Sequence, residues 1–250
     1  GVSVGDDVLV DGTVSEFYNA GSVGLSTTRI DLQGSPTISS TGNALPAPVV
    51  IGVGGRVPPT EVIENDTGGG SVETAGIFDP QTDGIDFYES LEGMLVQVND
   101  PIAVGPTEDN AIPVVTDDGS YATFMAERNG VMAGVVIREN DFNPERLLVA
   151  NPSVSNPPAV DVGYHLTGPV TGTIDYDDVQ TYGNFYLVNA NPLSATPGGL
   201  TPETTTVAAT ESYLTVASFN VYNLDPGDTQ QKFDSLASQT WPAGMNHRVE

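Results

Sequence analysis

One short acidic segment in the first half of the sequence has the residue types and spacing of a calcium-binding loop. The segment DPQTDGIDFYES, residues 79–90, has oxygen-bearing side chains at its first, third and fifth positions and glycine at its sixth. An EF-hand loop starts in the same way, because Ca²⁺ takes six to eight oxygen ligands and the glycine permits a sharp turn. The twelfth position is serine instead of glutamate, so the complete motif is absent. The carboxylates expected in an irregular structural Ca²⁺ site are Asp79, Asp83, Asp86 and Glu89. The alternative is a polar turn that caps a short helix.

Other catalytic chemistry has little support in the sequence. A serine hydrolase needs a histidine base beside its serine, and the chain has only His165 and His247 and no G-x-S-x-G. His165 lies in the strand-like run VGYHLTG, so we expect an ordinary strand residue. No P-loop and no dinucleotide-binding glycine pattern occurs. With 33 acidic residues, no carboxylate pair stands out as a glycosidase pair.

The charge of the chain limits its partners. Its 33 acidic and 7 basic residues give a formal net charge of −26. Such a surface repels phosphate, and the basic residues form no cluster that could follow a nucleic-acid backbone. We therefore expect an acidic surface suited to salty, marine or halophilic surroundings, and contact with nucleic acid only through divalent cations. The absence of cysteine excludes disulfides and Cys-ligated metals, and no apolar run is long enough to span a membrane.

The hydrophobic pattern predicts a mainly β chain. Short alternating runs are separated by turns rich in glycine and proline, which number 28 and 19. Residues 4–17 predict a half-buried strand bent at Gly12, and residues 87–91 predict a short helical turn. VSVGDDVLVDGTVSEFY (2–18) resembles VDVGYHLTGPVTGTIDYD (160–177), which favours two related modules. A bent strand with a corner glycine is typical of small oligonucleotide/oligosaccharide-binding (OB) barrels, although an immunoglobulin-like sandwich fits similar spacing.

These observations predict four parts. Residues 1–77 and 78–195 are expected to be two OB-like modules, and residues 196–212 an extended linker rich in Pro, Thr, Gly and Ala. Residues 213–250 predict the start of an α/β domain, because an apolar strand is followed by a turn and by helical spacing.

The last part carries a resemblance to a known family. LTVASFNVYNLDPGDTQQKFDSLASQ, residues 214–239, resembles the opening strand and helix of the endonuclease/exonuclease/phosphatase superfamily, which has the deoxyribonuclease-I-like fold. The upstream segments VGDDVLVDGTVSEF, FYESLEGMLVQV and VTGTIDYDDVQTYGNFYLV resemble recurrent segments of the modules that precede this domain in secreted bacterial nucleases. The resemblance covers about residues 2–239 and is sharpest at its end.

The resemblance implies a function for the parent protein. It also implies that this chain, by itself, has no catalytic activity. Asn220 matches the family asparagine that positions a divalent metal and the scissile phosphate, and Mg²⁺ assists the hydrolysis in the complete enzyme. The family's metal-binding glutamate and catalytic histidines have no match in this chain. We therefore expect an inactive accessory region, a spacer or substrate-positioning part of an extracellular or cell-surface bacterial nuclease, whose first partner is the rest of its own catalytic domain.

Two alternatives remain open from the residues alone. One is a calcium-stabilised adhesion module, and the other is a carbohydrate-binding module, which OB-like barrels also permit. Tyrosines that could stack on sugars or bases, or serve as ordinary sheet residues, are Tyr18, Tyr88, Tyr164, Tyr176, Tyr182 and Tyr186.

Overall fold

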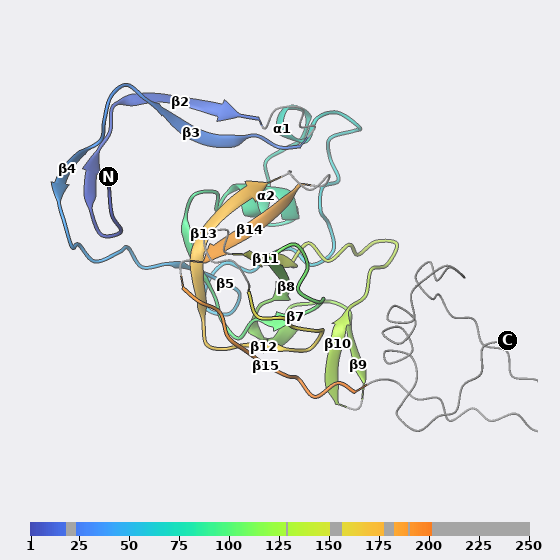
Figure 1. Ribbon diagram of the computed structural model, residues 1–250. Helices are drawn as coiled ribbons and strands as arrows, with labels where there is room; N and C mark the ends of the chain where they lie inside the picture. Colours follow the sequence, from blue (N-terminus) through green and yellow to red (C-terminus); the bar gives the residue numbers. More distant parts are fainter. Residues whose placement is uncertain (19–23, 129, 151–156, 178–182, 190, 202–250) are drawn as a thin grey trace, which may run out of the picture. The chain divides into compact units, whose positions relative to one another are not determined.

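The computed structural model describes residues 1–18, 24–128, 130–150, 157–177, 183–189 and 191–201 (Figure 1). The chain divides into two compact units, Gly1–Leu200 and Thr201–Glu250. This division falls inside the predicted linker. The predicted α/β start, residues 213–250, and Asn220 with it, lie outside the described residues.

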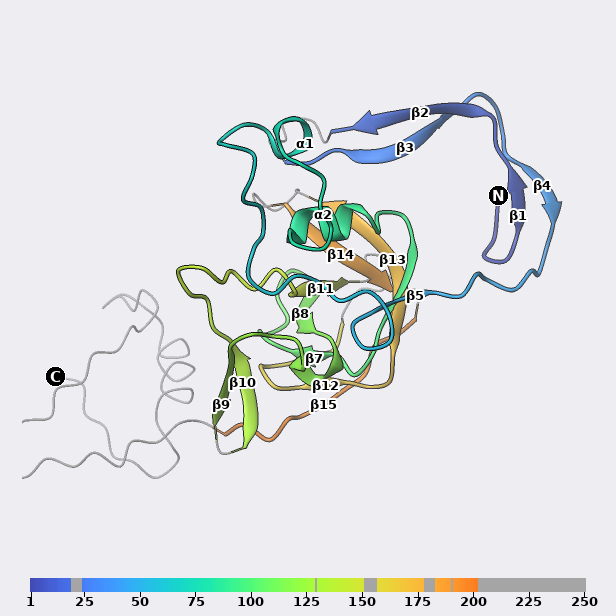
Figure 2. The same cartoon turned by 180° about the vertical axis from the view of Figure 1, so that it is seen from behind.

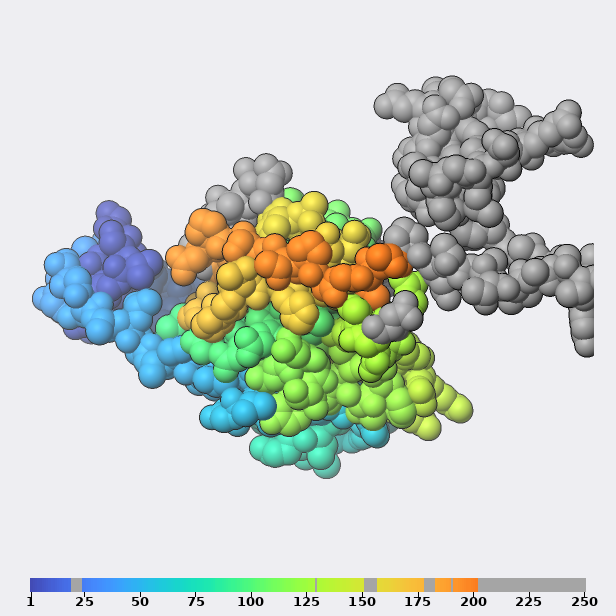
Figure 3. Space-filling model, turned by 90° about the horizontal axis from the view of Figure 1, so that it is seen from below, coloured from blue at the N-terminus to red at the C-terminus, as the bar shows by residue number. Residues whose placement is uncertain are grey.

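One sheet of nine strands forms the centre of the first unit. In spatial order its strands are β15 (Ala195–Thr196), β12 (His165–Leu166), β7 (Ile102–Ala103), β8 (Ala111–Val115), β11 (Leu147–Ala150), β14 (Asn184–Asn189), β13 (Val170–Asp177), β6 (Leu95–Val98) and β5 (Val49–Ile51). The β5–β6 and β11–β14 pairs are parallel and the others antiparallel. Figure 3 shows the segment that contains β15, in orange, lying across the surface beside the yellow segment that contains β12.

The core lies along this sheet and under the helix α2 (Gly84–Glu89). Buried and partly buried residues alternate in β6 and through the first half of β13, as expected for strands with one covered face. Phe87 and Leu91 place the apolar side of α2 and the turn after it in the same core, and the Tyr88 ring stacks on that of Phe185 in β14 with centroids 5.4 Å apart. Figure 2 shows α2 beside β13 and β14 from the back. The predicted helical turn at 87–91 thus belongs to a helix that begins three residues earlier.

Four strands near the N-terminus form two separate ribbons. β1 (Asp7–Leu9) pairs with β4 (Thr37–Ser40), and β2 (Gly12–Phe17) pairs with β3 (Thr27–Leu32). The predicted half-buried strand at 4–17 is therefore two strands with different partners, and Val14 is 66% exposed. A two-stranded ribbon cannot by itself bury an apolar face. Gly12 permits the close approach of the β3 backbone, since a Cβ there would lie 2.6 Å from the Asp31 carbonyl oxygen.

The remaining elements are short. β9 (Met125–Arg128) and β10 (Val131–Val135) form a hairpin. The helical pieces besides α2 are α1 (Val72–Ala75) and the 3₁₀ turn η1 (Asp117–Gly119). Within the described residues, no helix combines the length and the hydropathy needed to cross a bilayer.

The prediction of a mainly β chain is confirmed, but closed OB-like barrels do not occur in the described part of the chain. Closure requires the end strands of a sheet to pair with each other. Among the strands that the structure describes, β5 pairs with β6 and β15 with β12, and these end strands have three and two residues. The segments 2–18 and 160–177 are not equivalent either, because the first supplies ribbon strands and the second supplies β12 and β13 of the large sheet. Across the predicted module boundary at 77–78, β5 pairs with β6.

Candidate metal centre

Two backbone hydrogen bonds hold residues 61–66 against the first turn of α2. The Gly84 N–H donates to the Val62 carbonyl at 3.0 Å, and the Ile85 N–H donates to the Ile63 carbonyl at 3.1 Å. This pairing brings the acidic end of one segment next to the acidic loop 79–86.

The loop itself folds back before α2 begins. The N–H groups of Thr82 and Asp83 donate to the Asp79 carbonyl at 3.0 and 3.2 Å, and the Asp79 N–H donates to Asp86 Oδ2 at 2.6 Å. Asp83 occupies the N-cap position of α2, yet its carboxylate makes no capping hydrogen bond. The alternative of a simple capping turn therefore does not account for the Asp83 side chain.

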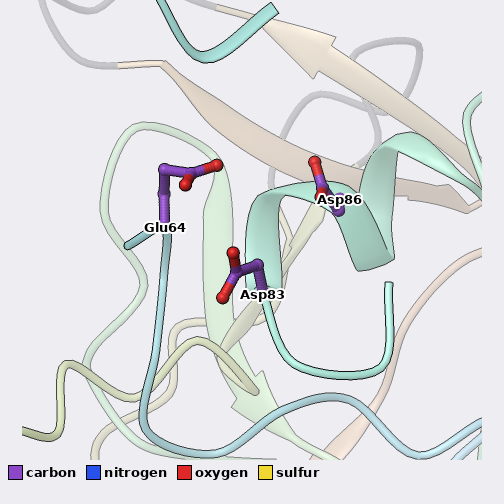
Figure 4. Close-up of side chains that lie close together, drawn as sticks. All are labelled: Glu64, Asp83 and Asp86. Atoms are coloured by element: carbon purple, nitrogen blue, oxygen red, sulfur yellow. The ribbon is translucent and has the colours of Figure 1, made fainter. Parts of the chain in front are cut away.

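Five carboxylates meet around Asp83 in two overlapping groups. One group is Glu64, Asp83 and Asp86, and the other is Asp66, Asp79 and Asp83. Within each group, one oxygen per residue lies within 4.8 Å of the others. Figure 4 shows Glu64 on the neighbouring segment with its carboxylate directed toward α2, where Asp83 and Asp86 lie.

The electrostatics of Asp83 favour a bound cation. Its side chain is 1% exposed, and neither Oδ1 nor Oδ2 has a hydrogen-bond partner. Burial raises the pKa of Asp83 to about 6, and the charges of Asp79 and Glu64 add to this effect. An ionised carboxylate in such a place destabilises the fold by several kcal/mol unless an opposite charge compensates it. A divalent cation between the two groups would supply that charge.

The donor set fits a hard cation, and Ca²⁺ in particular. All five side chains offer carboxylate oxygens, and the set contains neither histidine nor cysteine, which are the common ligands of zinc. Ca²⁺ accepts six to eight oxygens in variable geometry, whereas Mg²⁺ requires a near-ideal octahedron and keeps several waters. Because Asp83 and Asp86 are 1% and 7% exposed, an ion held by them would be shielded from large substrates.

Comparison with known proteins places this site inside a family domain. Residues 50–197 match the model of a family described as a domain of unknown function, DUF8508. The chain belongs to this family. No curated protein and no solved structure matches the chain. The match includes α2, all five carboxylates, and the nine-stranded sheet except the first residue of β5.

The DUF8508 domain brings together three of the four predicted ligands. Asp79, Asp83 and Asp86 belong to the two groups, and Glu89 belongs to neither. Glu89 lies one helical turn beyond Asp86, where burial raises its pKa to about 7 and the charges of Glu92 and Glu73 add to this effect. Because successive residues rise along the helix axis, the Glu89 carboxylate lies farther from the loop 79–86 than the Asp86 carboxylate does.

Glu64 and Asp66 are missing from the predicted site. The run TEVIENDTGGG contains both residues, and its acidic composition is visible in the sequence. Its contact with α2 could not be predicted from the sequence, because the two hydrogen bonds join residues that are 22 positions apart and follow no local pattern.

Two other candidate functional residues of the domain, His165 and Tyr88, lie outside the acidic site. His165 Nδ1 lies 3.0 Å from Asp118 Oδ1, and the two side chains are 44% and 58% exposed. The Tyr88 ring packs between Phe87 and Phe185 and is 4% exposed, so its face cannot stack on a sugar or base. Tyr182 lies outside the described residues.

Proposed function

We propose that the DUF8508 domain is a non-catalytic β module stabilised by Ca²⁺ and that it is an accessory region of an extracellular, metal-dependent nuclease. The observation that carries the calcium part is Asp83, a buried carboxylate with two unpartnered oxygens among four further carboxylates. A bound cation would compensate this buried negative charge, and a ligand set made only of carboxylate oxygens suits a hard cation.

The ion would have a structural role. Its ligands come from residues 61–66 and from the loop and first turn of α2, so it would clamp two segments that are otherwise joined by two backbone hydrogen bonds. A catalytic metal must keep a position open for substrate, and the burial of Asp83 and Asp86 argues against such access.

The accessory role rests on the resemblance of residues 214–239 to the start of a nuclease catalytic domain. The charge of −26 disfavours direct contact with nucleic acid. The module would then act as a spacer, or would meet substrate through divalent cations.

Thermal unfolding of the 250-residue chain in Ca²⁺ and in EGTA tests the calcium part. Ca²⁺ is expected to raise the melting temperature, and Asp83→Asn is expected to reduce the rise because the site around Asp83 is lost. Asp109→Asn is the matched control, because it removes the same charge at an exposed turn residue outside both groups. An unchanged melting temperature for the parent chain would refute a structural calcium ion.

A nuclease assay tests the accessory part. The 250-residue chain is expected to release no nucleotides from DNA or RNA in Mg²⁺, whereas a longer protein that completes the catalytic domain is expected to do so. Metal-dependent hydrolysis by the 250-residue chain that is lost in Asn220→Ala would overturn the non-catalytic assignment. A longer reading frame without nuclease motifs would favour the adhesion alternative.

A further inference from the structure

A second group of buried polar side chains lies in the segment DFNPE, residues 141–145. Asp141, Asn143 and Glu145 are 2%, 4% and 4% exposed. These residues alternate with Phe142 and Pro144, so three oxygen-bearing side chains come from one five-residue stretch. None of them belongs to the groups around Asp83.

The segment is held by hydrogen bonds that leave most polar atoms of these side chains without partners. The Arg138 N–H donates to the Asp141 carbonyl at 2.8 Å, and the Phe142 N–H donates to the Glu61 carbonyl at 3.2 Å. The Asn143 N–H donates to Asp141 Oδ1 at 3.0 Å, and Asn143 has a left-handed backbone with φ of 52°. The buried side-chain atoms of this segment without a hydrogen-bond partner are Asp141 Oδ2, Asn143 Oδ1, Asn143 Nδ2, Glu145 Oε1 and Glu145 Oε2.

The two flanking arginines do not neutralise this segment. The Arg138 guanidinium lies over the Phe124 ring, 3.4 Å from its centroid, and Arg146 donates to Asn184 Oδ1 at 3.2 Å. No ion pair joins either arginine to Asp141 or Glu145 in the described part of the chain. Among the described residues, Asp141 and Glu145 therefore have no ion-pair partner.

We propose that Asp141, Asn143 and Glu145 bind a second divalent cation of the Ca²⁺ class. Four oxygens from alternating residues of one stretch, two of them on a glutamate that can bind in bidentate fashion, match the way calcium loops present ligands. A cation bound in this segment would supply the opposite charge that the two buried carboxylates lack.

Protonation of Glu145 is the competing explanation. Burial raises the pKa of Glu145 to about 7, opposed by the N–H of its own backbone and supported by the charge of Asp141. A neutral Glu145 could donate to one neighbour, and the buried Tyr88 hydroxyl also lacks a partner. One proton on Glu145 can serve only one acceptor, so that arrangement leaves at least one of Asp141 Oδ2 and Asn143 Oδ1 without a partner.

Equilibrium dialysis of the 250-residue chain against Ca²⁺ in 1 M NaCl tests the proposal. The salt reduces the Debye length to about 3 Å and so suppresses loose binding to the acidic surface. The parent chain and Asp109→Asn are expected to hold two ions. Asp83→Asn and Glu145→Gln are each expected to hold one, and the double variant none, with at least a tenfold loss of affinity at each altered site.

Glu145→Gln has the shape of the protonated side chain and keeps the hydrogen bonds that this form could make, so its fold is expected to persist by circular dichroism. Asn143→Ala removes a proposed ligand without changing charge and is expected to weaken the same ion. Two ions on Glu145→Gln, or one ion on the parent that Glu145→Gln retains, would overturn the second site. Loss of an ion in Glu145→Gln without any change in Asp83→Asn would instead refute the site around Asp83, so the two proposals fail separately.

Discussion

Gly84 lies in direct contact with Pro144, and this contact joins the two acidic segments of the domain. A Cβ on residue 84 would come closer than 3.0 Å to the Cβ of Pro144. Gly84 follows Asp83, a ligand of the first proposed ion, and Pro144 precedes Glu145, a ligand of the second. The contact between Gly84 and Pro144 therefore connects the two proposed sites. The close packing explains why a glycine begins α2.

Gly84→Ala is expected to destabilise the chain by about 1–3 kcal/mol, because an added methyl group displaces Pro144 in a packed region. Helix propensity alone predicts the opposite sign, since alanine is favoured over glycine in a helix by about 1 kcal/mol. Denaturant unfolding distinguishes the two. Stability equal to or above that of the parent would contradict the close contact.

Asp83→Asn is expected to have opposite effects with and without calcium. In EGTA at pH 8 it removes a buried charge that has no partner, so the free energy of unfolding should rise by about 1–3 kcal/mol. In Ca²⁺ at a hundred times its dissociation constant, the parent should gain about 2.7 kcal/mol and the variant nothing from this site. Asp109→Asn should stay within about 0.5 kcal/mol of the parent in both buffers. Destabilisation of Asp83→Asn in EGTA would contradict the unpaired buried charge.

Glu89→Gln is expected to stabilise the chain above about pH 4.5 and increasingly up to about pH 7. The folded pKa of Glu89, about 7, lies above its ordinary value of 4.5. The folded state therefore binds the proton more tightly, and ionisation of Glu89 destabilises it increasingly as the pH rises from 4.5 to 7. The variant lacks this cost, so its advantage should reach about 1 kcal/mol at pH 8, allowing for solvent screening, and vanish below pH 4.5. Unfolding curves in EGTA measure the difference, and an advantage independent of pH would contradict the assignment to Glu89.

Leu91→Ala and Leu9→Ala form a matched pair that locates the core. Leu91 is 0% exposed under the large sheet, and Leu9 is 68% exposed on the β1–β4 ribbon. The first change should cost about 2–5 kcal/mol, and the second should stay within about 0.5 kcal/mol. Thermal or denaturant unfolding gives both values. A comparable loss in Leu9→Ala would mean that the ribbon contributes to the core.

Part of the candidate site could be predicted because its spacing is local. Asp79, Asp83 and Asp86 lie within eight residues, and the same short stretch forms the turn that brings them together. Glu89 fits the same spacing but extends beyond the turn. Glu64 and Asp66 join the site only through hydrogen bonds to the start of α2, and the segment 141–145 contacts residues 61 and 84 through Phe142 and Pro144.

The fold likewise has features that local sequence patterns predicted and features that depend on long-range contacts. Short apolar runs separated by turns predicted the mainly β class correctly, because the side-chain pattern of a strand reflects its own geometry. The corner glycine at residue 12 was interpreted as a barrel bend, but it instead permits the close approach of β3. Barrel closure depends on which strands pair at the two ends of a sheet, and that information is not local.

The sequence by itself therefore determined the β class, the acidic surface and the loop that begins the metal centre, since composition and short-range spacing express these directly. Only the tertiary structure decided the open nine-stranded sheet, the two additional carboxylates around Asp83 and the burial of the segment from Asp141 to Glu145. Each of these arises from contacts between residues far apart in the chain, and burial is what makes an ordinary acidic residue a candidate cation ligand.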